Sequence, residues 1–109
     1  MHELGITQSI VEIVAERAGS AKVDRVTLEI GRLSAVLPDA IRFCFDVCTQ
    51  GTELDGAQLQ IIEISGRGRC RQCGQELEMK DFLARCACGS IDLECIAGQE
   101  LNIKEMELA

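Results

Sequence analysis

The sequence predicts an α+β fold: a sheet of about three strands, two helices packed on it, and a small zinc-ribbon-like insert. Apolar residues recur at three- and four-residue spacing in two segments, as in amphipathic helices, and at every second position in others, as in strands. A cysteine-rich stretch, residues 66–97, holds five of the seven cysteines and precedes the last strand. Helices and strands that share one apolar layer in this way are typical of a two-layer domain.

The first half of the chain predicts a helix, a strand and a second helix. The first helix is expected over residues 4–18, where isoleucines and valines line one face and Gly19 follows the end. The segment VDRVTLEIGRL, residues 23–33, alternates between apolar and polar side chains and predicts a half-buried strand. Pro38 suits the first turn of the second helix, and Gly51 lies just beyond its end.

Two further strands are expected on either side of the insert. The segment AQLQIIEIS, residues 57–65, has apolar residues on both faces, which suggests cover on both sides. The last segment, ELNIKEMELA, alternates but shifts phase between Ile103 and Met106, which predicts a β-bulge. The insert, residues 66–97, has few large apolar side chains, and so short a stretch does not fold on a small core alone. We therefore expect its cysteines to hold it together.

Composition limits the class of protein. The 109 residues suit one domain, or one domain with a small module. The net charge of −7 argues against nucleic acid, because phosphate contacts need a basic surface. No apolar run reaches the roughly 18–20 residues of a membrane span, and the amino terminus lacks the features of a signal peptide. We therefore expect a soluble, cytoplasmic protein without membrane insertion.

The insert carries two cysteine pairs. Cys70 and Cys73 lie in CRQCG, and Cys86 and Cys88 lie in CACGS. An odd number of cysteines without a secretory leader favours metal binding over disulfides. Two pairs, each followed by a glycine that relieves a tight turn, can place four thiolates around one ion. Zinc is the expected metal, because it takes thiolates well in a tetrahedron and has no redox chemistry.

Alternatives to this site remain open from the residues alone. The second pair is C-x-C, one residue shorter than the usual spacing, so Cys95 is an alternative to Cys88 as the fourth ligand. A rubredoxin-like iron centre uses similar pairs, and C-x-x-C can form a thiol–disulfide couple. Cys44 and Cys48 lie four residues apart on the apolar side of the second helix, where we expect core packing.

The amino terminus is a second candidate metal site. His2 is the only histidine, and it stands beside the α-amine of Met1. That amine, the His2 amide nitrogen and the imidazole can form fused chelate rings, and the amide of Glu3 or an external ligand can complete a plane. Such a square-planar set suits Ni(II) or Cu(II) better than zinc. The alternative is a solvated, frayed terminus.

Motifs along nearly the whole chain resemble the HypA/HybF family. They are, in order, MHELGITQSIVEIVAERA, VDRVTLEIGRLSAV, FCFDVCTQGTELDGAQLQI, CRQCG, CACGS and GQELNIKEMEL. Members of this family are nickel-insertion accessory proteins for [NiFe]-hydrogenase maturation, and some also serve urease. One departure is the second cysteine pair, since the family typically has C-P-x-C where this chain has CAC, which leaves the fourth zinc ligand open.

The resemblance implies the site residues and the partners. Nickel, the cargo, is expected in a domain of residues 1–65 and 98–109, and structural zinc in the insert of residues 66–97. The implied ligands are the Met1 α-amine, His2 and the adjoining Glu3 for Ni(II), and Cys70, Cys73, Cys86 and Cys88 for Zn(II), with Cys95 as the alternative fourth. The implied partners are the hydrogenase-maturation GTPase and the [NiFe]-hydrogenase large-subunit precursor.

We predict metal transfer rather than catalysis as the function. With one histidine, and no nucleophile beside a base or phosphate-binding loop, the sequence gives no support for an enzyme. The rival hypothesis from another class is a zinc-ribbon interaction or scaffold module with no nickel role. It differs from the nickel hypothesis in making the amino terminus dispensable.

Overall fold

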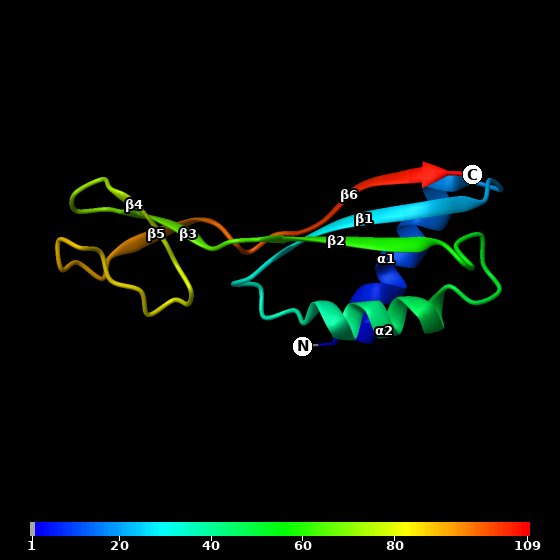
Figure 1. Cartoon of the computed structure of the whole chain (residues 1–109), viewed down its shortest axis with the longest axis horizontal. Helices are drawn as coiled ribbons and strands as arrows, with labels where there is room; N and C mark the ends of the chain where they lie inside the picture. Colours follow the sequence, from blue (N-terminus) through cyan, green and yellow to red (C-terminus); the bar gives the residue numbers. More distant parts are fainter. Residues whose placement is uncertain (1) are drawn as a thin grey trace.

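The computed structural model describes residues 2–109, and the Met1 amine of the expected nickel site lies outside them. The molecule is elongated, with extents of 54 × 22 × 17 Å. Two three-stranded sheets lie end to end, and both helices lie against one of them (Figure 1). The elements, in chain order, are α1 (Glu3–Ala18), β1 (Val23–Gly31), α2 (Pro38–Cys48), β2 (Gln58–Ile64), β3 (Arg67–Cys70), β4 (Glu76–Glu78), β5 (Leu93–Ala97) and β6 (Leu101–Leu108). The predicted α+β class is confirmed.

The larger sheet has the order β2-β1-β6. β1 pairs in parallel with β2, because α2 carries the chain back across the layer between them. β6 returns antiparallel to β1 after the insert. The register shifts where Thr27 pairs with Glu105 but Leu28 pairs with Ile103, so the extra residue, Lys104, forms the expected bulge.

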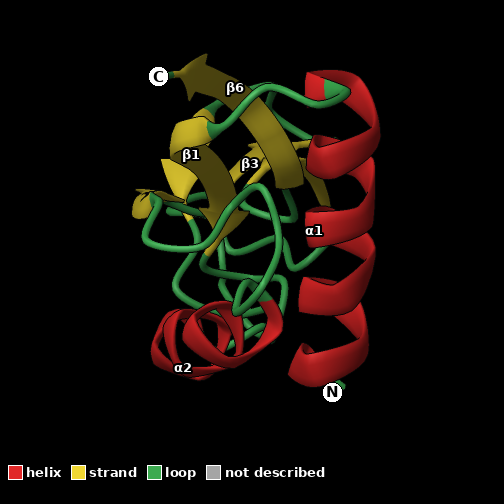
Figure 2. Cartoon of the chain, turned by 90° about the vertical axis from the view of Figure 1, so that its right-hand side faces the viewer, coloured by secondary structure: helices red, strands yellow, loops and turns green. Residues whose placement is uncertain are grey.

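The core lies between this sheet and the two helices, which run in different directions (Figure 2). Val26, Leu28 and Ile30 alternate along β1 and are at most 1% exposed, as the two-residue period of a strand requires. The helices cover them with apolar side chains. The buried helix residues are Ile10, Val11 and Val14 from α1 and Ile41 and Phe45 from α2.

The expectation that β2 is covered on both faces is wrong. β2 is an edge strand of the sheet, and each of its residues is half-buried or exposed. Ile61 faces the core, whereas Ile62 points to the other side and is half-buried. Both faces of β2 therefore keep partial access to solvent, which the apolar run in the sequence does not reveal.

Three glycines join the two sheets. The chain leaves the larger sheet at Gly66 and re-enters it at Gly98, and a Cβ atom on Gly98 would lie 2.6 Å from the Gly66 Cα. A Cβ on Gly31, at the end of β1, would lie 2.0 Å from the Gly98 carbonyl oxygen. Leu33 packs beside this crossing, and its N–H donates to that oxygen at 2.7 Å. Backbones can approach this closely only where side chains are absent.

The smaller sheet, with the order β4-β3-β5, carries the cysteine pairs at its far end. Its strands are short, at three to five residues. The apolar interior is correspondingly small, with Met79 4% exposed and packed over Gly68. Apart from glycines, Cys70 and Cys86 are the other buried residues, so sulfur makes up much of the interior of this unit.

Candidate metal centres

Four cysteines converge at the end of the smaller sheet. The sulfur atoms of Cys70, Cys73, Cys86 and Cys88 all lie within 4.8 Å of one another. The Sγ atoms of Cys70 and Cys88 are 3.6 Å apart, as are those of Cys73 and Cys86. A zinc ion with sulfurs at about 2.3 Å in a tetrahedron separates them by about 3.8 Å. The four sulfurs are therefore grouped at a spacing close to that of a tetrahedral zinc centre.

Local turns bring each pair into place. β3 ends at Cys70, whose carbonyl accepts the N–H of Gly74 at 2.8 Å and closes the first turn. The Cys86 carbonyl accepts the N–H of Gly89, also at 2.8 Å, and closes the second. Gly74 and Gly89 have φ values of 78° and 94°, which glycine adopts without strain. The shortened C-x-C pair therefore still brings both its sulfurs into the group.

Cys95, the alternative fourth ligand, lies elsewhere. It is on β5, and its Sγ contacts the carbonyl oxygen of Ala97 at 3.4 Å. Within residues 2–109, the one group of three or more potential ligands at metal-binding distance contains Cys88 and not Cys95. The spacing in the sequence left these two cysteines undecided, and the geometry favours Cys88.

The thiols influence one another's ionisation. The backbone N–H of Cys73 lies 3.4 Å from the Sγ of Cys70. This contact, with smaller effects of the Gln72 amide and the neighbouring thiols, outweighs burial and lowers the pKa of Cys70 to about 6. The Gln75 amide lowers the pKa of Cys73, but the adjacent Cys86 thiol, burial and the other thiols outweigh it and raise that pKa to about 12. One thiolate therefore opposes the ionisation of the next. A bound cation would offset this repulsion and let all four thiols ionise, as metal ligation requires.

At the other end of the molecule, His2 precedes α1. It is exposed, and its carbonyl oxygen accepts the N–H of Ile6 at 3.0 Å as the helix begins. The Glu3 carboxylate accepts the N–H of Leu37 at 3.2 Å, and this bond lowers the pKa of Glu3. The first turn of α1 is thus tied to the residue that precedes α2. No local sequence pattern predicts this contact, because the two residues are 34 positions apart.

Cys44 and Cys48 lie outside the four-cysteine site. Both are half-buried on α2, and Cys48 packs against the core, where burial raises its pKa.

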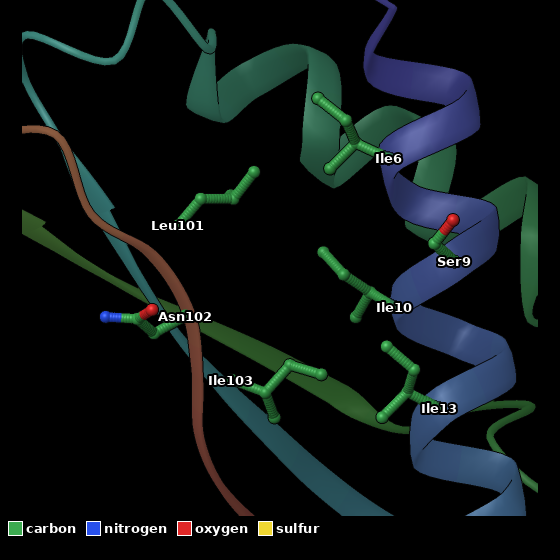
Figure 3. A pocket seen from close by; sticks show the side chains of 7 residues that line it. All are labelled: Ile6, Ser9, Ile10, Ile13, Leu101, Asn102 and Ile103. Carbon is green, nitrogen blue, oxygen red and sulfur yellow. The ribbon is translucent and has the colours of Figure 1, made fainter.

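Between α1 and β6 there is a shallow groove of about 570 Å³, and Figure 3 shows its side chains. Its lining is apolar apart from Ser9 and Asn102 and contains no ionisable group. None of the helices in residues 2–109 is long and apolar enough to span a membrane.

The fold and the site define a small α+β metal-binding protein with a four-cysteine module. The family model described as hydrogenase/urease nickel incorporation, metallochaperone, HypA matches residues 1–108, and the chain belongs to this family. It is 63% identical over 108 residues to the hydrogenase maturation factor HypA of Nostoc punctiforme, covering 99% of this chain and 96% of that protein. Identity to the HypA of Geobacter metallireducens is 50% over 109 residues, covering 99% of each chain.

Solved structures agree on the fold. The solution structure of a HypA protein superposes with a TM-score of 0.73 at 21% identity, covering 100% of this chain and 97% of that one. The solution structure of the Ni metallochaperone HypA from Helicobacter pylori superposes with a TM-score of 0.68 at 22% identity, covering 99% and 97%. The family model and the HypA relatives confirm the resemblance inferred from the sequence motifs, and the solved structures agree with the fold.

Proposed function

We propose that this chain binds Ni(II) at its amino terminus and delivers it during [NiFe]-hydrogenase maturation. The ligands in this proposal are the Met1 α-amine, the imidazole and amide nitrogen of His2, and the amide of Glu3. Residues 1–65 and 98–109 carry the nickel function, and residues 66–97 form the zinc module. The receiving protein is the large-subunit precursor, and the maturation GTPase assists. A urease apoprotein is a second destination, since the family description also names urease.

The observation that carries the proposal is the position of His2 in a chain of this family. It is the only histidine in the chain, it is exposed, and it lies directly before α1 rather than in the core. The hydrogen bond from the Leu37 N–H to the Glu3 carboxylate supports the proposal, because this bond holds the first turn of α1 in place without involving the His2 imidazole. An exposed site with few side chains allows an acceptor's ligands to replace the original ones one at a time.

The zinc part of the proposal rests on the chemistry of the donor set. Four cysteine sulfurs with tetrahedral spacing suit Zn(II), which has no redox chemistry and keeps a closed structural site. Such an ion contributes its binding free energy to folding, which a unit with strands of three to five residues needs. We assign zinc a structural role and nickel the role of cargo.

Nickel titration of His2→Ala tests the proposal. Zinc-loaded wild type, His2→Ala and the control Gln8→Ala, an exposed position on α1, are titrated with Ni(II) by calorimetry. We expect Gln8→Ala to match the wild type and His2→Ala to lose at least about 100-fold in affinity, since even the groups that support a ligand contribute about 10–100-fold. Unchanged affinity in His2→Ala would leave the zinc-ribbon interaction module as the better hypothesis.

A further inference from the structure

The chain has only three aromatic side chains, and two of them lie on the surface. Phe45 is 1% exposed in the core, whereas Phe43 on α2 is 71% exposed and Phe82 in the zinc module is 58% exposed. Val47, one turn after Phe43, is 50% exposed. Single exposed apolar residues are ordinary, but a phenylalanine with a valine four residues away on the same helix forms a continuous apolar surface.

The pattern of α2 shows that its apolar side is wider than the core covers. At 100° per residue, apolar positions extend over about 200° of the helix, from Phe43 round to Phe45. Ile41 and Phe45 are buried against the sheet and α1, and Cys48 is half-buried beside them. Phe43 and Val47 form the other margin and contact solvent. A helix that needed only to cover the core would carry polar residues there.

This surface begins at the proposed nickel end. Leu37, the residue before α2, is 63% exposed, and its N–H is the donor to the Glu3 carboxylate. The Leu37–Glu3 bond places the start of α1 beside the first turn of α2, as Figures 1 and 2 show. From Leu37 to Val47 the helix extends about 15 Å, at 1.5 Å per residue. A protein that covered Leu37, Phe43 and Val47 would therefore also reach the terminus at His2.

The charge distribution indicates the kind of protein that fits. Residues 66–97 contain five basic and five acidic side chains, so the remaining residues contain six basic and thirteen acidic ones and carry the whole net charge of −7. Asp46 lies beside Phe43 on the helix and is exposed, whereas Asp39 on the same side forms an ion pair with Arg42 at 2.8 Å. Two copies of so acidic a surface repel each other, whereas a surface with lysine and arginine is attracted.

We propose that Leu37, Phe43 and Val47 form the docking surface for the protein that accepts the nickel. The partner presents an apolar pocket that receives Phe43, with a basic side chain on its rim that faces Asp46. This inference rests on the proposed nickel-transfer function, because the partner is defined by taking the metal. Docking at this surface brings the acceptor's ligands to the exposed terminus, where they can replace those of the chaperone.

The test compares two equivalent phenylalanine substitutions. Wild type, Phe43→Ala, Val47→Ala and the control Phe82→Ala are loaded with nickel and titrated with the [NiFe]-hydrogenase large-subunit precursor as the probe. We expect Phe43→Ala and Val47→Ala to weaken the association about 10-fold or more, and Phe82→Ala to bind as wild type does. Association should also weaken as salt is raised, because opposite charges face each other.

The outcomes distinguish failure of this docking proposal from failure of the proposed nickel-transfer function. If Phe43→Ala binds the precursor like the wild type, if the wild type does not bind it, or if Phe82→Ala loses as much affinity, the proposal is overturned. A wild-type chain that dimerises in light scattering, and that Phe43→Ala makes monomeric, also overturns it in favour of a second copy. Nickel titration of the same variants is expected to stay unchanged. If the wild type binds no nickel, the proposed function fails on its own.

Discussion

Replacement of Gly98 by alanine tests how the two sheets are joined. Gly98 has a φ of 112°, a conformation that L side chains rarely adopt. A Cβ there would lie 2.6 Å from the Gly66 Cα and 3.0 Å from the Cδ1 of Leu33. The leucine end can shift, but the Gly66 backbone is held on either side by strands β2 and β3. The added methyl group must therefore push the two connecting segments apart.

Two contributions set the expected loss of stability. The unfavourable backbone conformation costs about 1–3 kcal/mol for a residue other than glycine. Overpacking by an added methyl group costs about 1–3 kcal/mol more. We expect the free energy of unfolding to fall by about 2–6 kcal/mol, a large part of the roughly 5–15 kcal/mol that stabilises a domain.

The assay is urea denaturation of the zinc-loaded protein, with Gly56→Ala as the matched control. Gly56 has a φ of 79°, but no atom lies within 4 Å of an added Cβ. The control therefore measures the backbone contribution alone, about 1–3 kcal/mol. If Gly98→Ala is no more destabilising than Gly56→Ala, the close crossing of the connecting segments does not exist in solution, and our account of the junction is wrong.

Three further predictions concern the zinc site, the core and the Glu3 contact. Cys88→Ser should leave the purified protein without zinc, whereas Cys95→Ser should retain one zinc per chain by metal analysis; the reverse result would make Cys95 the fourth ligand. Phe45→Ala should lower the free energy of unfolding, measured in urea, by about 3–5 kcal/mol, because the Phe45 ring is buried. Phe43→Ala should change it by less than about 0.5 kcal/mol, because the Phe43 ring is exposed. Since the Leu37 N–H lowers the pKa of Glu3, the Glu3 carboxylate stabilises the fold above its unfolded pKa, and this contribution is lost as the pH falls through the folded pKa. The melting temperatures of wild type and Glu3→Gln should therefore differ at neutral pH and converge in acid, and a constant difference would count against the contact.

The sequence predicted most of the fold because periodicity carries the information. The repeat of apolar residues placed α1 over residues 4–18, and the structure has it at Glu3–Ala18. The phase shift between Ile103 and Met106 predicted the bulge, since a strand can change face only by an extra residue. The position of β2 at the edge of the sheet was not predictable in this way, because periodicity does not say which strands are neighbours.

The same distinction between local patterns and long-range contacts applies to the candidate site. Short cysteine spacings brought each pair together in the sequence, so the group of four could be expected before the structure was known. The choice between Cys88 and Cys95 could not be made, because it depends on where β5 lies relative to the turn that holds Cys86. The bond from Leu37 to Glu3 and the crossing of Gly66 and Gly98 are long-range contacts that no local pattern encodes.

Nickel titration of a chain extended at its amino terminus tests the central claim most directly. Adding Gly-Ser before Met1 keeps His2 and every described contact but moves the free α-amine away from the imidazole. Both proteins are zinc-loaded, have matching circular dichroism spectra and are titrated with Ni(II) by calorimetry. We predict that the extension lowers nickel affinity at least about 100-fold, with loss of the absorption band of square-planar Ni(II). Equal affinity and an unchanged band in the extended chain would contradict nickel binding at the amino terminus.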